Sequence, residues 1–332
     1  MNINEKIIID QGKVNDFIHL VDLHGFGGRH ILSGYIAEFD DCSVIMDCGS
    51  SLNVKWMLRY LKKHNISKTS IKYLLTSHHH FDHNGGMWKL YEEIKKENPE
   101  VKILTNQKTM ELLNDFEEHL NRGKRTYGNL IGVMKPIEED AFKIIEPSNK
   151  FGKDINNLEI HGTFELNGSK IRMSVLKTPG HTPDHQSILF VRNGIQEFIF
   201  FGEAIGTLYH SSKLVTTPTS MPIYFNFREY MNSVENLRKL NPKQAGFGHY
   251  GVVNGENNVQ KIMEEHKNFM NEFRELIIKY YNEKPETKYI VEKITPFLTK
   301  RTDIKSEFSE VFRNIVLGVV YGMMVDLGYR KA

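Results

Sequence analysis

The chain has 332 residues, 43 of them basic and 41 acidic, for a formal net charge of +2. Hydrophobic residues make up 40% and charged residues 25% of it, which is typical of a soluble globular protein. This balance gives no overall attraction to nucleic acid or to an acidic membrane, and no stretch approaches the roughly 20 apolar residues of a membrane span. A nucleic-acid partner is therefore not favoured, and we expect no membrane partner.

The first 14 residues carry scattered charges and lack a long apolar core, so we expect no signal peptide. The two cysteines, Cys42 and Cys48, lie too close in sequence for a useful structural disulfide. Both features favour a reduced, cytoplasmic setting.

The first half of the chain alternates short apolar runs with segments of helical spacing. Strands are expected at 17–22, 32–39, 43–46, 71–75 and 101–104, and helices at 53–64, 87–97 and 109–120. The glycine-rich segment 25–30 is interpreted as a hairpin loop. Residues 106–153 are interpreted as an insertion that overhangs the site described below.

Two hairpins are predicted next, at 164–176 and 187–201, each with an Asn-Gly pair in its turn. A helix at 226–240 and a strand at 244–247 follow, and then helical spacing at 256–281, 286–298 and 304–327. We predict a catalytic domain at 1–253 and a C-terminal helical region at 254–332. The last helix has a broad apolar face, which either packs on the main domain or forms a homodimer through the C-terminal helices.

Histidine and aspartate side chains are concentrated in one stretch, residues 76–86. It holds His78, His79, His80, Asp82 and His83 directly after an apolar run. Neutral imidazole and ionised carboxylate are ligands that zinc, iron and manganese prefer. The alternative, a solvated histidine-rich loop, is disfavoured because the stretch ends a strand pattern and opens a helix pattern. The stretch therefore predicts a metal site.

Other candidate ligands also follow apolar runs. Asp47, His181, Glu203 and His249 each come at or just after the end of an expected strand. In layered α/β folds, sites collect where loops leave the strand ends. We expect these side chains to share one site with the histidine stretch.

These residues carry a resemblance to the metallo-β-lactamase superfamily. The central motif, 78–86, is similar to the superfamily's His-x-His-x-Asp-His signature with its following glycines. Segments 47–49, 178–183, 202–203 and 248–249 resemble the other motifs in order, with Glu203 where the fourth usually has Asp. The resemblance covers about residues 14–253. It implies an α/β fold, an αββα four-layer sandwich, here with a C-terminal helical appendage.

The resemblance also implies a ligand set. The first metal is held by His78, His80 and His181, the second by Asp82, His83 and His249, and Glu203 bridges them. Two divalent ions are implied, zinc as first choice, with iron or manganese as alternatives. A metal-bridging hydroxide attacks the substrate, and Asp82 is the catalytic residue that helps move its proton. Asp47 is expected to orient a ligand histidine, and His185 to hold its loop or touch substrate.

Substrate recognition is expected from aromatic and basic residues on two walls of a pocket. They are Tyr209, Tyr224, Phe225 and Arg228 on one wall and Arg29 and His30 on the other. Such a pocket suits an organic ester, thioester or phosphoester with an anionic part, and the alternative is that the aromatics are simply core.

The function expected is that of a dinuclear metal-dependent hydrolase of a small ester, thioester or phosphoester. It resembles the glyoxalase II-like branch, with Glu203 in place of the bridging aspartate. The alternatives are a phosphodiesterase or nuclease of the same superfamily, a di-iron oxidoreductase, and a metal-bound effector with little turnover. A true β-lactamase is disfavoured, because many of those enzymes have cysteine where this chain has Glu203.

Overall fold

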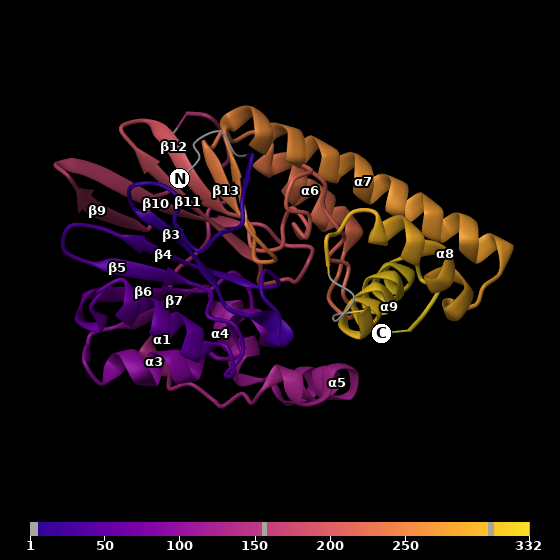
Figure 1. Ribbon diagram of the computed structural model, residues 1–332, viewed down its shortest axis with the longest axis horizontal. Helices are drawn as coiled ribbons and strands as arrows, with labels where there is room; N and C mark the ends of the chain where they lie inside the picture. Colours follow the sequence, from indigo (N-terminus) through magenta and orange to yellow (C-terminus); the bar gives the residue numbers. More distant parts are fainter. Residues whose placement is uncertain (1–5, 155–157, 305–308, 332) are drawn as a thin grey trace.

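The computed structural model describes residues 6–154, 158–304 and 309–331. Its centre is a pair of sheets packed face to face (Figure 1). The first sheet has the order β2-β3-β4-β5-β6-β7-β8, with strands β2 (Gly12–Lys13), β3 (Ile18–Asp22), β4 (Ser33–Glu38), β5 (Ser43–Met46), β6 (Ile71–Leu75), β7 (Lys102–Thr105) and β8 (Phe142–Ile144). Its pairs are antiparallel from β2 to β5 and parallel from β5 to β8.

The second sheet has the order β1-β14-β13-β12-β11-β10-β9. Its strands are β1 (Ile7–Ile8), β9 (Gly162–Leu166), β10 (Ser169–Lys177), β11 (Gln186–Arg192), β12 (Ile195–Phe200), β13 (Gln244–Gly246) and β14 (Val252–Asn254). β12 and β13 pair in parallel, and the other pairs are antiparallel.

The helices cover the outer faces of the sheets. They are α1 (Val54–Lys63), α2 (Phe81–Asn84), α3 (Met87–Lys95), α4 (Gln107–Asn114), α5 (Glu117–Tyr127), α6 (Phe227–Leu237), α7 (Glu256–Glu283), α8 (Thr287–Thr299) and α9 (Ser309–Asp326). Short 3₁₀ turns are η1 (Gly25–Gly27), η2 (Lys68–Ser70), η3 (Gly128–Ile131) and η4 (Glu139–Ala141).

The alternation of side chains along the strands builds the layers. On β4, Tyr35 lies in the core between the two sheets, whereas its neighbour Ile36 packs with α1 and α3. On β11, Phe190 faces the inter-sheet core and Leu189 faces α6 and α7. Both faces of both sheets are therefore apolar, and the four layers form the αββα sandwich that was predicted.

Most expected elements are present within a residue or two of their predicted bounds. The prediction of one helix at 109–120 is wrong, because the segment forms α4 and α5 with a break at Asp115, whose backbone leaves the helical region (φ −95°, ψ 58°). The break lets α5 swing out toward α9 (Figure 1). Four short strands, β1, β2, β8 and β14, were not predicted from the sequence.

The C-terminal helices belong to the core that covers the second sheet. The inward side chains of α9, which are Val316, Val319, Val320, Met323 and Met324, are buried within the chain. Positions 305–308 of the helix expected at 304–327, and residues 1–5, lie outside the described residues. The domain boundaries, the insertion at 106–153 and the homodimer stay predictions. No described helix is long and apolar enough to cross a membrane, and Cys42 and Cys48 are buried free thiols.

Candidate metal centre

The predicted ligands come from the loops that follow four strands, and they meet at one edge of the sandwich. His78 and His80 follow β6, Asp82 and His83 lie in α2, His181 follows β10, Glu203 follows β12 and His249 follows β13. All seven side chains are buried or nearly so, with Asp82 the most exposed at 19%. The structure therefore brings together every residue of the predicted ligand set.

The first group consists of His78, His80, His181 and Glu203. His181 Nε2 lies 3.2 Å from His78 Nε2 and 3.1 Å from His80 Nδ1. Glu203 Oε2 lies 2.8 Å from the same His181 nitrogen. Three ring nitrogens and a carboxylate oxygen thus converge on one point, as the ligands of a metal ion do.

The second group consists of Asp82, His83 and His249. His83 Nε2 and His249 Nε2 are 3.0 Å apart, and Asp82 Oδ2 is 3.4 Å from His249 Nε2. Glu203 Oε2 is also 3.3 Å from His83 Nε2 and 3.3 Å from His78 Nε2. A single oxygen of Glu203 therefore lies between the two groups.

Hydrogen bonds behind the rings fix which nitrogens carry protons. His181 Nδ1 lies 2.6 Å from the carbonyl oxygen of Thr219, and His249 Nδ1 lies 2.8 Å from that of Ile31. A carbonyl only accepts, so both Nδ1 atoms donate, and in this tautomer each ring points an Nε2 lone pair into the centre. Rings held in this way are oriented to bind a metal ion.

The Asp47 carboxylate holds the histidine stretch in place through hydrogen bonds. Its carboxylate accepts hydrogen bonds from Ser77 N (2.7 Å), Ser77 Oγ (2.6 Å), Asn84 Nδ2 (2.8 Å) and His83 Nδ1 (3.2 Å). Because Ser77 Oγ donates to Asp47, it accepts from His78 Nδ1 at 2.9 Å. Asp47 thus orients two histidines, one directly and one through Ser77.

His185 forms hydrogen bonds that hold the loops beside Glu203, which is one of the two roles expected for it. Its Nε2 accepts a hydrogen bond from the backbone N of Glu203 at 3.0 Å, and its Nδ1 lies 2.8 Å from Thr178 Oγ1. Gly202 precedes Glu203 with φ +60°, and a Cβ there would lie 2.7 Å from His185 Nε2. Glycine is therefore needed at 202 to let the Glu203 backbone reach this ring.

Burial sets the charge of the rings at the centre. It lowers the pKa of His78 and of His80 well below the usual value, and neighbouring histidines add to the effect. These two rings are neutral at pH 7, which is the form that binds a metal. For His83 burial acts in the same direction, but Asp82, Asp47 and Glu203 outweigh it and raise the pKa. An ion bound there takes the place of a proton.

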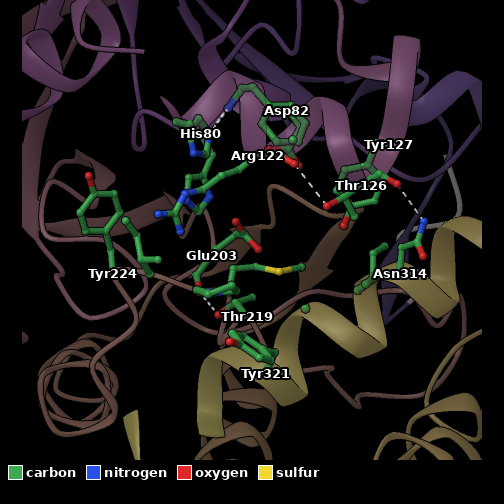
Figure 2. A pocket seen from close by; sticks show the side chains of 18 of the residues that line it. His80, Asp82, Arg122, Thr126, Tyr127, Glu203, Thr219, Tyr224, Asn314 and Tyr321 are labelled. Atoms are coloured by element: carbon green, nitrogen blue, oxygen red, sulfur yellow. Dashed lines mark hydrogen bonds between the residues drawn. The ribbon is translucent and has the colours of Figure 1, made fainter. Parts of the chain in front are cut away.

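A cavity of about 640 Å³ opens onto the centre, and His249 lies in its wall. Figure 2 shows His80, Asp82 and Glu203 in the same wall. Its other walls are α5, α9 and the segment 218–224. Asn314 Nδ2 of α9 donates to the backbone oxygen of Thr126 of α5 at 3.0 Å. The two helices therefore meet across the cavity.

The predicted substrate residues are divided between several places. Tyr209 and Tyr224 line the large cavity. Phe225 is buried in the core beside Tyr230, and Arg228 is exposed on α6; neither lines this cavity. Arg29 and His30 line a separate cavity of about 300 Å³, in which Tyr209 also has a wall position.

Several residues beside the centre were missed. His119 stacks on His80 with ring centroids 5.0 Å apart. Asp184 accepts from both the backbone N (2.8 Å) and Nδ1 (2.9 Å) of His79. The sequence signal for Asp184 was its place within the third motif, between His181 and His185. His119 had no spacing signal, because it reaches the site from α5.

The comparison with known proteins decides the family. A family model described as the metallo-beta-lactamase superfamily matches residues 27–249. This chain belongs to that superfamily. Members of the metallo-β-lactamase superfamily are generally hydrolytic metalloenzymes, and the histidine and glutamate cluster of this chain is able to hold metal.

Relatives within the superfamily share the fold over most of the chain. The chain is 29% identical over 249 residues to the metallo-beta-lactamase fold-containing protein ST1585 of Sulfurisphaera tokodaii, covering 72% of this chain and 82% of the relative. The crystal structure of ST1585, from Sulfolobus tokodaii, has a TM-score of 0.61 at 23% identity and covers 92% of this chain and 98% of that one. TTHA1429 from Thermus thermophilus has a TM-score of 0.60 at 14% identity, covering 95% and 94%.

Proposed function

We propose that this chain is a dinuclear metal-dependent hydrolase that acts on a small carboxylic ester or thioester. The observation that carries the proposal is the position of Glu203 Oε2, which lies within 3.3 Å of ring nitrogens from both ligand groups. A carboxylate oxygen shared by two histidine clusters suits two adjacent ions better than one.

The ligand sets proposed are those expected from the sequence. His78, His80 and His181 would hold one ion, Asp82, His83 and His249 the other, and Glu203 would serve both. Imidazole and carboxylate suit zinc, which is our first choice, with iron or manganese as alternatives. When bound, such ions supply an activated water and Lewis-acid charge.

The chain's own residues would handle protons and position the substrate. Asp82 is the more exposed of the two carboxylates of the centre, at 19%, and it lines the cavity, so it would accept a proton from a water there. Burial, with the nearby Glu203 and Asp82, raises the pKa of Tyr209, so its phenol stays protonated. Tyr209 is therefore able to donate a hydrogen bond to a substrate oxygen.

The charge of the cavity wall favours a carboxylic ester over a phosphoester. Among the described residues that line it, Arg122 is the one arginine or lysine, and its Nη2 is bonded to Glu118 Oε1 at 2.7 Å. Nucleases and phosphodiesterases that act on nucleic acids rely on lysine and arginine contacts to the phosphates. We therefore rank them below esterase activity. A di-iron oxidoreductase and an effector with little turnover rank lower still. Within the superfamily, the glyoxalase II-like branch and a cytoplasmic location stay our proposals.

The test is elemental analysis of the purified protein, followed by hydrolysis assays on an ester, a thioester and a bis-phosphodiester. We expect two ions per chain and preference for the ester or thioester. His80→Ala should lose metal and reduce hydrolysis by more than the roughly 10–100-fold that loss of a supporting partner causes. His64→Ala, at an exposed position on the far end of α1, is the control. Full metal content in His80→Ala, or preference for the bis-phosphodiester, would contradict the proposal.

A further inference from the structure

The cavity over the metal centre is apolar on the sides away from the ligands. Segment 218–224 contributes Pro218, Met221, Pro222, Ile223 and Tyr224, and α9 contributes Ile315, Leu317 and Tyr321. Figure 2 shows Tyr224 and Tyr321 on the walls that surround Glu203. Leu317 is 43% exposed and Tyr224 36% exposed, so this apolar surface is open to a ligand.

Charge is nearly absent from the same walls. Outside the metal centre, the Asp, Glu, Arg and Lys side chains among the described lining residues are Asp115, Glu118 and Arg122. Arg122 is held by Glu118 through both Nε (3.2 Å) and Nη2 (2.7 Å). No unpaired cation among them would attract a phosphate or a carboxylate. The apolar wall therefore suits an uncharged group better than the anionic part expected from Arg29 and Arg228.

The packing of α9 places this surface at a fixed distance from the centre. A Cβ at Gly322 would lie 1.9 Å from the Ser220 backbone oxygen, and Ser220 Oγ donates to Val319 O at 2.7 Å. α9 thus lies directly against segment 218–224, which also holds Thr219, the acceptor for His181 Nδ1. The apolar wall and the ligand histidine share one rigid support.

We propose that the acyl part of the substrate is an uncharged apolar chain longer than butyryl, bound between α9 and segment 218–224 with its carbonyl at the metal centre. This inference rests on the proposed hydrolase function. In the reaction the acyl C–O or C–S bond breaks and the water oxygen bonds to the acyl carbon. One water proton leaves with the alcohol or thiol, and the other stays with the carboxylic acid formed.

The first experiment measures kcat/KM of the metal-loaded protein on p-nitrophenyl acetate, butyrate, hexanoate, octanoate and decanoate. We expect kcat/KM to rise by up to about fourfold per added methylene until the wall is covered, the fold-change equivalent to about 0.8 kcal/mol per buried CH₂. Equal values across the series, or a fall beyond acetate, would overturn the inference while leaving the hydrolase intact.

Two matched variants locate the effect. Leu317 and Ile195 are exposed to 43% and 42%, but only Leu317 lines the cavity. Leu317→Asp should lower the ratio of decanoate to acetate kcat/KM at least tenfold, whereas Ile195→Asp should leave it unchanged. If Leu317→Asp leaves this ratio unchanged and melts at the same temperature as Ile195→Asp, the acyl chain binds elsewhere and the inference is rejected.

A binding experiment keeps the inference separate from the hydrolase proposal. Alkyl methyl ketones carry the same chain and carbonyl but are not hydrolysed. Calorimetric titration of the metal-loaded protein should show affinity that rises with chain length and falls in Leu317→Asp. If no ester is hydrolysed but this pattern holds, the proposed function is wrong and the apolar site stands. If the ketones bind without dependence on chain length, the apolar site is wrong.

Discussion

At the scale of single residues, the centre depends on atoms one layer behind the ligands. The rings of His181 and His249 are each held by a backbone carbonyl, whereas His83 is held by the side chain of Asp47. Asp47 is 0% exposed and adopts φ +53°, a conformation that aspartate tolerates better than most residues. The Asp47 carboxylate accepts hydrogen bonds from four donors at once, so a variant that lacks its negative charge tests its role.

Asp47→Asn should lower metal affinity by roughly 10–100-fold with little change in fold, because the amide keeps the shape but loses the charge that holds His83 Nδ1–H and Ser77. Competition with a chromogenic chelator measures the affinity. Asp41→Asn, at an exposed position before β5, is the control and should bind metal as the parent does. Equal affinity in the two variants would show that Asp47 does not orient the centre.

The ligand residues could be predicted because they carry two independent signals, residue type and position after an apolar strand. The predicted substrate residues carried only the first of these signals, residue type. Phe225 and Arg228 follow Tyr224 closely in sequence, but α6 begins at Phe227, and the turn before it directs Phe225 into the core and leaves Arg228 in solvent. Which side of a turn a residue faces depends on tertiary packing that spacing does not reveal.

At the scale of elements, α9 is the helix on which the cavity depends. Its face toward segment 218–224 carries two glycines, Gly318 and Gly322, four residues apart and so on one side of the helix. The apolar spacing of this helix was visible in the sequence. Its position opposite α5 was not, because α5 reaches it only after the break at Asp115.

The two glycines should respond differently to alanine. In Gly322→Ala the new Cβ meets the Ser220 backbone oxygen at 1.9 Å, so α9 must move, and we expect the free energy of unfolding to fall by about 1–3 kcal/mol. In Gly318→Ala it meets Met221 Sδ at 2.7 Å, a flexible end that can shift. The helix propensity of alanine, about 1 kcal/mol better than glycine, then offsets the contact. Urea unfolding of the metal-free variants measures both. Equal losses of unfolding free energy in the two variants would contradict this packing of α9.

At the scale of the whole molecule, the sandwich gathers at one edge residues that are up to 171 positions apart in the chain, from His78 to His249. The same packing buries a histidine outside the proposed ligand set, His266, and lowers its pKa. His266 is fully buried, with Tyr230 Oη 2.7 Å from Nε2 and Thr216 Oγ1 2.8 Å from Nδ1. Burial, with Arg301 adding to it, lowers the pKa of His266 from 6.5 to about 3.

Stability should therefore fall in mild acid. Between pH 6.5 and 3 the unfolded chain binds a proton at His266 that the folded chain does not, so the free energy of unfolding falls as pH falls, by about 1.4 kcal/mol per pH unit for this group. Urea unfolding of the metal-free protein at several pH values between 6 and 4 measures the slope. His266→Gln should reduce the slope of the free energy of unfolding against pH, because the unfolded variant no longer binds this one proton. The same slope in the variant would show that His266 takes up its proton in the folded state.

The layer order could be predicted from the strand and helix pattern together with the motif order, since the motifs fix which strand ends meet. The pattern does not reveal short strand pairings such as β1 with β14. These strands are only two to three residues long, and they join the edge of the sheet through tertiary contact. The candidate metal centre nevertheless lies at the ends of longer strands and does not involve these edge pairings.

Anomalous X-ray diffraction from crystals of the metal-loaded protein would locate the ions of the proposed dinuclear centre. We predict two peaks per chain, one among His78, His80 and His181 and one among Asp82, His83 and His249, with the Glu203 carboxylate between them. A single peak, or peaks away from these side chains, would contradict the dinuclear centre.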